Sequence, residues 1–175
     1  EIYCWGSNAY GQIGNGLNGY FEKVLSPHKV GDYKDWTDVK TGAGITCGIR
    51  AGEPYCWGLN GFGQFGDGTV QSKTTPFSTG TGNEWSEIVL GTWHSCGKKG
   101  AEVYCWGGYS YGQTGTGKIS IKTEPELIYE NGKILSVSLG VMHTCMIDSG
   151  KLFCWGFNQL GQVGDGTELN RAVPV

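Results

Sequence analysis

The sequence predicts an all-β protein built from repeated units of four short antiparallel strands, and three observations support this prediction. An aromatic residue followed by Cys-Trp-Gly occurs four times, and each copy runs into a second phrase, Gly-Gln-x-Gly-x-Gly. Strong turn signals such as Asn15-Gly16 and Asp67-Gly68 punctuate the chain. No stretch shows the apolar periodicity of an amphipathic helix. Four antiparallel strands in a repeat of about 40 to 50 residues are typical of one blade of a β-propeller.

The length of the repeat is constant after the first copy. The prolines that recur every 49 residues are Pro27, Pro76, Pro125 and Pro174. Cys4 and Cys56 are 52 residues apart, so the first copy carries three extra residues within Leu17–Glu22. We therefore divide the single domain 1–175 into repeats at about 1–30, 31–79, 80–128 and 129–175.

The strands follow one order in each repeat. In 31–79 they centre on Val39, Cys47, Cys56 and Pro76. The segment 1–30 holds only the last two strands, so we expect two strands and then three sets of four, about 3.5 blades. Side chains alternate along a strand, so cysteine and tryptophan in the Cys-Trp-Gly strands point to opposite faces. The tryptophans expected to fill the gaps between blades are Trp5, Trp57, Trp106 and Trp155.

Composition and charge exclude several classes of protein. Glycine is abundant, at 32 residues, but proline is scarce, at 5, and aromatic residues make up 13%, which separates the chain from disordered or collagen-like sequences. The balance of 13 Lys and Arg against 16 Asp and Glu gives no basic footprint for nucleic acid or an anionic membrane. No apolar run is long enough to span a bilayer. We predict neither a nucleic-acid partner nor membrane insertion.

Six of the seven cysteines form three pairs with one spacing. If Ser149-Gly150 is a two-residue turn, counting outward places Cys145 opposite Cys154, close enough for a disulfide. Each bridge would contribute roughly 2 to 3 kcal/mol on the chain-entropy model. Reduced thiols or zinc ligands are the alternatives, although zinc prefers ligands that converge on one ion. The predicted bridges join Cys47 to Cys56, Cys96 to Cys105 and Cys145 to Cys154. Bridges of this kind indicate an oxidising compartment, either extracellular or at the cell surface.

The repeat resembles that of the regulator of chromosome condensation family. The resemblance rests on Gly-x-x-His-[Ser/Thr]-Cys at Gly91–Cys96 and Gly140–Cys145, followed by Cys-Trp-Gly-x-Asn and the glycine-rich phrase, and it covers essentially the whole chain. It is closest to the cysteine-paired form of exported proteins. It implies a seven-bladed propeller, of which this chain is about half and the same polypeptide holds the remainder. An upstream Gly-x-x-His-[Ser/Thr]-Cys segment would then supply a partner for Cys4.

Two positions depart from this pattern. Ile45 replaces the histidine of the other units, and Tyr109 replaces the asparagine that follows Cys-Trp-Gly-x elsewhere. We expect the loops around these two positions to be less regular.

The candidate catalytic and ligand-binding motifs each lack a residue or a structural context that their chemistry requires. Gly112–Lys118 matches a phosphate-binding loop, but Ile119 stands where magnesium needs Ser or Thr, and no helix is predicted after it. His94 and His143 lie two residues before cysteines, but bridged cysteines offer no thiolate, and we expect these histidines to bond to neighbouring backbone. Asp32, Asp35 and Asp38 lack the pattern of a calcium loop and fit a solvated turn. We predict no catalytic residue, no cofactor and no metal site, and hence not an enzyme.

The variable loop positions are the predicted site of function, because propellers bind with their rims. The possible partner-binding residues of the rim are Tyr10, Phe62, Trp93, Tyr109, Tyr111 and Met142. Aromatic residues and methionine are typical of protein-binding hot spots, although each residue singly also fits packing between blades.

The leading function is an extracellular, non-enzymatic module for protein–protein interaction, self-assembly or structural assembly. The resemblance also implies an alternative, an exported inhibitor or regulator of another enzyme. An exchange factor for a small GTPase ranks below it, because paired cysteines would be reduced inside cells. A glycan-binding module is the third reading.

Overall fold

The computed structural model describes residues 1–108 and 110–175, and the regular elements of this part of the chain are β-strands in four antiparallel sheets. The first sheet pairs β1 (Tyr3–Ser7) with β2 (Lys23–Lys29). The second contains β3 (Trp36–Thr41), β4 (Ile45–Arg50), β5 (Glu53–Gly58) and β6 (Lys73–Ser78). The third contains β7 (Glu87–Leu90), β8 (His94–Lys99), β9 (Glu102–Gly107) and β10 (Lys122–Tyr129). The fourth contains β11 (Ile134–Leu139), β12 (His143–Asp148) and β13 (Lys151–Gly156).

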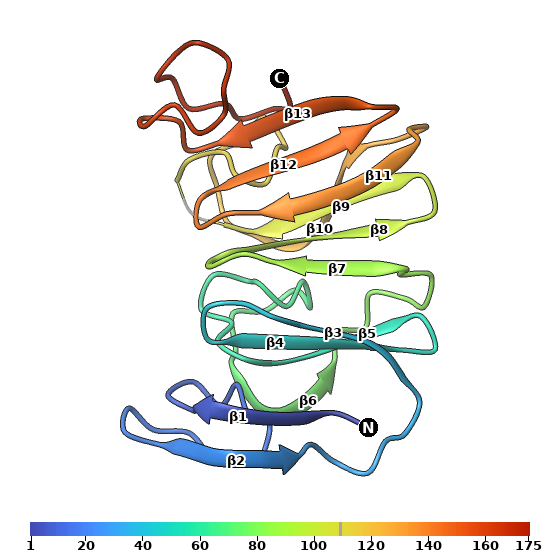
Figure 1. Cartoon of the computed structure of the whole chain (residues 1–175), viewed down its shortest axis with the longest axis vertical. Helices are drawn as coiled ribbons and strands as arrows, with labels where there is room; N and C mark the ends of the chain where they lie inside the picture. Colours follow the sequence, from blue (N-terminus) through green and yellow to red (C-terminus); the bar gives the residue numbers. More distant parts are fainter. Residues whose placement is uncertain (109) are drawn as a thin grey trace.

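The sheets are stacked in chain order along the longest axis of the molecule. Figure 1 shows β1 and β2 at one end and β13 at the other, with the two chain termini at opposite ends of the stack. In the two complete sheets each strand pairs with the next one in sequence. This meander of four strands is the arrangement of a propeller blade.

The tight hairpin inside each unit has the predicted register. Cys145 lies opposite Cys154 and Asp148 opposite Lys151, and the turn residues Ser149 and Gly150 both have positive φ, as a two-residue hairpin turn requires. The equivalent cysteines of the two preceding units are paired in the same way. All three predicted cysteine pairs are joined as disulfides in the structure, and Cys4 is a free thiol.

The prediction of three complete sets of four strands is wrong for the last unit, which has three strands. Its final segment makes backbone hydrogen bonds between Arg171 and Gly156 and between Val175 and Cys154. These correspond to the pairing of β6 with β5, where a further pair, Tyr55 with Ser78, extends the ladder. In the described residues this pairing is an isolated bridge and not a regular strand.

Tryptophans fill the gaps between sheets, with one exception. Trp57, Trp106 and Trp155 are buried, and burying about 150 Å² of each contributes roughly 3 to 4 kcal/mol of transfer free energy. Trp5 is 61% exposed in the described part of the propeller. Its strand β1 lies at the end of the stack, and no sheet of the described residues covers that face.

The substitution at Ile45 leaves the fold regular, contrary to the expectation. Ile45 opens β4 opposite Gly58, just as His94 opens β8 opposite Gly107. Its side chain is buried in a cluster that spans two sheets and includes Trp85 and Trp106. An apolar side chain satisfies this position because the site is inside the core. The second departure, Tyr109, lies outside the described residues.

Over the described residues, the structure contains no helix long and apolar enough to cross a bilayer.

Candidate binding site in the rim loops

We use the name rim loops for the segments 8–22, 59–72, 108–121 and 157–170, which follow β1, β5, β9 and β13. A buried asparagine shapes three of them: Asn8, Asn60 and Asn158. In each case the side-chain oxygen accepts a hydrogen bond from the backbone N–H five residues later, at Ile13, Phe65 or Val163. The side-chain amide then donates to the far arm of the loop. One polar side chain thus replaces the hydrogen bonds that a regular strand would provide.

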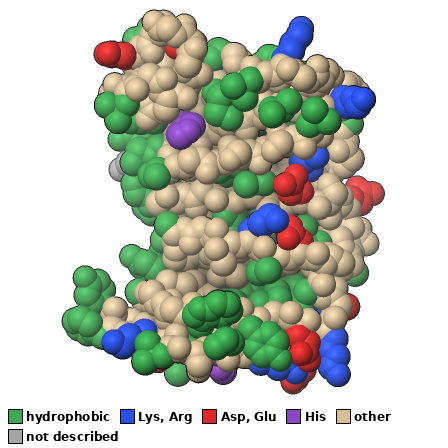
Figure 2. All heavy atoms as spheres, in the orientation of Figure 1, with side chains coloured by type: hydrophobic (Ala, Val, Ile, Leu, Met, Phe, Trp, Pro, Cys, Tyr) green, Lys and Arg blue, Asp and Glu red, His purple; other side chains and the backbone are tan. Residues whose placement is uncertain are grey.

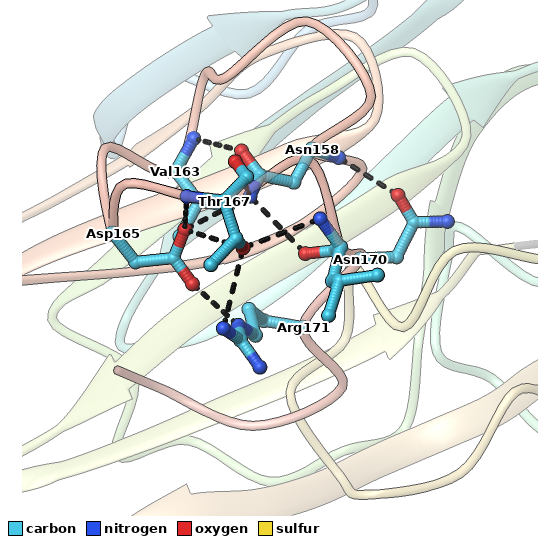
Figure 3. Close-up of polar contacts among 7 residues, drawn as sticks. Asn158, Val163, Asp165, Thr167, Asn170 and Arg171 are labelled. Carbon is cyan, nitrogen blue, oxygen red and sulfur yellow. Dashed lines mark hydrogen bonds and ion pairs between the residues drawn. The ribbon is translucent and has the colours of Figure 1, made fainter.

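The last rim loop shows the network in full (Figure 3). Asn158 Nδ2 donates to Asp165 Oδ1 at 3.1 Å and to the carbonyl of Thr167 at 2.9 Å. Asp165 Oδ1 also accepts hydrogen bonds from the backbone N–H and the hydroxyl of Thr167. Its Oδ2 forms an ion pair with Arg171 Nε at 2.5 Å. Burial acts to raise the pKa of Asp165, but the hydrogen bonds from Thr167 and Arg171 outweigh it and hold that pKa at about 2. The carboxylate is therefore a fixed, ionised part of the loop at neutral pH.

The glycine-rich phrase of each rim loop forms the junction with the next unit. The backbone carbonyl of Gln64 accepts two hydrogen bonds, from Ser95 Oγ at 2.8 Å and from Trp106 Nε1 at 2.8 Å. The carbonyl of Gln12 accepts from Thr46 and Trp57, and that of Gln113 accepts from Thr144 and Trp155, all at 2.8 to 2.9 Å. Each carbonyl uses both of its lone pairs, so the junction is polar but satisfied.

The same phrase needs glycine where the tryptophan packs on it. A Cβ on Gly66, which has a φ of +75°, would lie 2.8 Å from Trp106 Nε1. Gly14 and Gly115 stand in the same relation to Trp57 and Trp155. Beside these contacts, the N–H groups of Gly16, Gly68 and Gly117 donate to carbonyls of the next unit at 2.8 to 2.9 Å. Each junction therefore consists of a tryptophan that packs on a glycine, two side-chain hydrogen bonds to one carbonyl, from the indole and from a hydroxyl, and one backbone hydrogen bond.

The structure brings the predicted rim residues together in pairs across these junctions. Phe62 and Trp93 lie with ring centroids 5.7 Å apart, although they belong to successive units. Tyr10 covers Gly44 of the next unit, where a Cβ would lie 2.6 Å from its ring. Tyr10 is exposed, whereas Phe62 and Trp93 are half-buried.

Tyr111 pairs with a residue that the sequence reasoning did not select. Its ring contacts Phe157 of the next unit at 5.0 Å, in a T-shaped arrangement. Phe157 follows Gly156 directly, and its backbone N–H donates to the carbonyl of the half-buried Met142. No signal within one hairpin indicates this contact, because it joins two units. The sixth predicted rim residue, Tyr109, lies outside the described residues.

The histidine at the start of β8 has a different partner from the expected backbone group. His94 Nε2 lies 2.9 Å from Thr144 Oγ1, a hydroxyl of the next unit. Because the single proton of that hydroxyl goes to the carbonyl of Gln113, the ring nitrogen must be the donor. His94 is fully buried, and its Nδ1 has no partner among the described residues. Burial, with a smaller contribution from His143, lowers the pKa of His94 to about 3.

This geometry removes the chemistry that the two histidines suggested. The cysteines beside them are in disulfides, so neither offers a thiolate for a Cys/His pair. In the Gly112–Lys118 loop the N–H groups of Gly115 and Gly117 already bind the carbonyls of Gly112 and Ala172, so they cannot cradle a phosphate.

The three aspartates considered for calcium each pair with a separate cation. Asp35 makes a bidentate ion pair with Arg50, with Nε–Oδ1 at 2.7 Å and Nη2–Oδ2 at 3.0 Å. Asp32 lies near Lys29, and Asp38 near Lys40. Asp38 is part of β3, so the three do not form the expected solvated turn. Across residues 1–108 and 110–175, no group of three metal-ligating side chains converges.

Stacked four-stranded meanders, joined by tryptophan junctions and edged by loops on one rim, define this chain as a segment of a β-propeller. The sequence matches the Regulator of chromosome condensation (RCC1) repeat over residues 1–49, 101–147 and 149–175. The chain therefore belongs to the RCC1 repeat family, and it covers about half of a propeller.

Solved structures agree with this assignment of the fold. The chain is similar to human WBSCR16, with a TM-score of 0.81 and 21% identity, over 99% of this chain and 47% of that one. It is also similar to Prp20p from Saccharomyces cerevisiae, reported with its binding properties to Gsp1p and histones, with a TM-score of 0.83 and 21% identity, over 99% and 45% of the two chains. Yeast RCC1 (Prp20) bound to Kap60 gives a TM-score of 0.81 at 19% identity, over 99% and 44%. This chain spans less than half the length of these structures.

Proposed function

We propose that this chain is part of an extracellular, non-enzymatic propeller that binds a protein partner through its rim loops. The observation that carries the proposal is the row of aromatic contacts on the rim, Tyr10 on Gly44, Phe62 on Trp93 and Tyr111 on Phe157. Their identities differ from unit to unit, while the asparagine, the glycines and the Cys-Trp-Gly strand around them recur. Variable aromatics on a rigid frame are the composition of an interaction surface.

Relatives in the family support binding as the kind of function. Prp20p is described with binding to Gsp1p and histones, and yeast RCC1 (Prp20) is bound to Kap60. Regulation of another protein is therefore the second candidate. We propose that the partner of this chain differs from those of Prp20p, because the disulfides of this chain favour an oxidising compartment.

The exposed end of the stack supports a further element of the proposal. Cys4, the equivalent of Cys56, Cys105 and Cys154, has no disulfide partner, and Trp5 beside it lacks a covering sheet. We place the repeats that complete the propeller in the same polypeptide, with one cysteine bound to Cys4. Peptide mapping of the native protein without reduction tests this element, and a native protein with an intact mass close to 18.8 kDa contradicts it.

The experiment on the rim uses a matched pair of variants. Tyr10→Ser with Tyr111→Ser removes two variable rim aromatics, and Leu135→Ser removes an exposed apolar side chain of β11 at the end of the strand away from the rim. Each protein is immobilised and challenged with a panel of purified secreted proteins. A partner that binds the parent should bind the rim variant about 5- to 100-fold more weakly and the Leu135 variant equally well. Equal binding by the parent and the rim variant, both folded, would remove the rim as the binding site.

A further inference from the structure

Two successive units place a cation against aromatic rings at the end of their second strand. Arg50 and Lys99 are 49 residues apart and therefore occupy the same place in their units. Lys99 Nζ lies 4.5 Å from the ring centroid of Trp85 and 5.7 Å from that of Tyr104. The equivalent rings beside Arg50 are Trp36 and Tyr55. The two units thus share a cation with two aromatic neighbours.

Arg50 has a third ring that Lys99 lacks. The guanidinium carbon of Arg50 lies 3.6 Å from the ring centroid of Tyr33. The residue 49 positions after Tyr33 is Gly82, which has no side chain. A Cβ on Gly82 would meet only Lys99 Nζ within 4 Å, at 3.7 Å. The position from which a ring reaches the cation of one unit is therefore open space in the next.

A groove of about 330 Å³ opens beside Lys99, between the second and third sheets. The side chains that line it include Asp67, Thr81, Trp85, Lys99, Tyr104 and Glu124. A cavity of about 150 Å³ is already large enough to hold benzene. Both sheets that form the groove have all four strands, so the ends of the chain take no part in it.

The junction between the third and fourth sheets closes the same place with a ring of its own. Asp148 replaces the cation there, and Tyr129 donates its hydroxyl to Asp148 Oδ2 at 2.7 Å. The ring of Tyr129 lies 6.1 Å from that of Phe153, which is the equivalent of Tyr104. Among the three junctions of the described residues, the one at Lys99 alone has no tyrosine of the connecting loop at this place.

The backbone keeps the groove beside Lys99 open. Gly82 has a φ of +90°, a conformation that is strained for any residue with a side chain, so the loop does not favour a tyrosine here. Lys99 Nζ donates to the carbonyl of Thr81 at 3.0 Å, which holds the ammonium beside the groove. A ring that completes this stack therefore has to come from outside the chain.

We propose that this groove binds an aromatic side chain of a protein partner, which stacks on the ammonium of Lys99 as Tyr33 stacks on the guanidinium of Arg50. A cation is attracted to the π face of an aromatic ring, and a sugar or an aliphatic side chain has no such face. None of the aromatic contacts of the rim lines the groove. The site is therefore additional to the rim and goes beyond the proposed function.

The surroundings of the site are polar, which makes the ring itself the feature that is recognised. In the view of Figure 2, the Lys, Arg, Asp and Glu side chains lie mostly on the side of the molecule where the hairpin turns of Figure 1 lie. Lys99 is the last residue of β8 and adjoins one of these turns.

The test compares two capped amino acids that differ only in whether the ring is aromatic. N-acetylphenylalaninamide and N-acetylcyclohexylalaninamide are each titrated into the protein, and binding is followed by the NMR shifts of the backbone amides. We expect the aromatic amide to bind with a dissociation constant on the order of 1 mM and the saturated one about 3- to 30-fold more weakly. The largest shifts should be those of Thr81, Lys99 and Tyr104.

Two lysine variants form a matched pair. Lys99→Met keeps an unbranched side chain but removes the ammonium, so it should weaken binding of the aromatic amide about 3- to 30-fold and abolish the preference for it. Lys73 Nζ lies 4.6 Å from the ring centroid of Phe77, a similar pair outside the groove, so Lys73→Met should bind like the parent. The rim variant, Tyr10→Ser with Tyr111→Ser, should also bind like the parent.

Three results would overturn the proposal. The first is equal affinity of the parent protein for the two amides, a comparison that requires no variant. The second is a set of shifts that avoids the groove, and the third is a folded Lys99→Met protein that keeps the preference. Loss of binding in the rim variant would place the ring on the rim and would also reject the groove. Failure of the groove in any of these ways leaves the test of the proposed function unchanged.

Discussion

Trp106 and Trp5 occupy the same place in the same phrase but lie in opposite environments. Trp106 is 2% exposed, donates its indole proton to the carbonyl of Gln64 and packs on Gly66. Trp5 is 61% exposed at the end of the stack. Both follow a cysteine in a strand of the same sequence, so the strand decides only where the side chain points. Burial comes from the neighbouring unit, as expected when the stability of a repeat protein resides in its interfaces.

The most direct test of this comparison is to truncate each of the two tryptophans. Trp106→Ala should lower the free energy of unfolding by about 3 to 5 kcal/mol, because it empties a core site and leaves a buried carbonyl with one donor fewer. Trp5→Ala should change it by less than about 0.5 kcal/mol. Urea unfolding at micromolar protein concentration measures both. Similar losses in the two variants would show that Trp5 contributes to folding through contacts within its own sheet.

The cysteines allow the same comparison between an internal unit and the first unit. The Cys96–Cys105 bridge is buried between two strands, whereas Cys4 is unpaired. Replacing Cys96 and Cys105 together by Ala should cost roughly 2 to 3 kcal/mol, because it frees a short loop in the unfolded chain. Cys4→Ala should cost much less. The midpoints of thermal unfolding check this prediction, and equal shifts for the two variants would contradict it.

The junctions at Ile45 and His94 differ in one buried titratable group, which predicts a pH dependence. Because burial lowers the pKa of His94 to about 3, from 6.5, the unfolded chain takes up a proton first as the pH falls. Stability is therefore lost between pH 6.5 and about 3, and this residue should make the protein about 2 kcal/mol less stable at pH 5 than at pH 7. His94→Ile, which copies the junction at Ile45, should remove this component. If urea unfolding at the two pH values shows the same loss in parent and variant, His94 is not its source.

The smallest expected effect concerns the last rim loop. Hydrogen bonds from Thr167 and Arg171 hold the pKa of Asp165 at about 2, below its ordinary 3.8, so its contribution to loop order is present above pH 3.8 and is lost as the pH falls through about 2. The amide of Thr167 donates to Asp165, and its NMR shift should titrate with a midpoint near pH 2. A midpoint near pH 4 would show that the network does not stabilise the carboxylate. Asp165→Asn should abolish this transition.

Sequence reasoning reached the fold because the informative signals were local. The turn at Ser149-Gly150 defines the register that pairs Cys145 with Cys154, and the alternation of the Cys-Trp-Gly strand separates tryptophan from cysteine. Such features depend on residues within one hairpin. The repeat then extends them along the chain.

Contacts between units were beyond the same reasoning. His94 forms a hydrogen bond with Thr144, fifty residues later in the sequence, and not with the neighbouring backbone that we expected. The acceptor of Trp106 is a backbone carbonyl, which has no signature in the sequence. The partnership of Tyr111 with Phe157 likewise requires the position of one unit on the next.

At the three described junctions the acceptor of the tryptophan is a main-chain atom, and this makes the units interchangeable in that contact. No side-chain replacement at Gln12, Gln64 or Gln113 can delete the carbonyl, while each following unit brings its own hydroxyl and indole. Excising residues 80–128 would therefore bring the carbonyl of Gln64 to Thr144 and Trp155, the same donors in the same order. Duplication of a 49-residue cassette would likewise create a new junction without a single compensating mutation. The number of blades in such a chain can change by recombination of its coding sequence, one whole unit at a time.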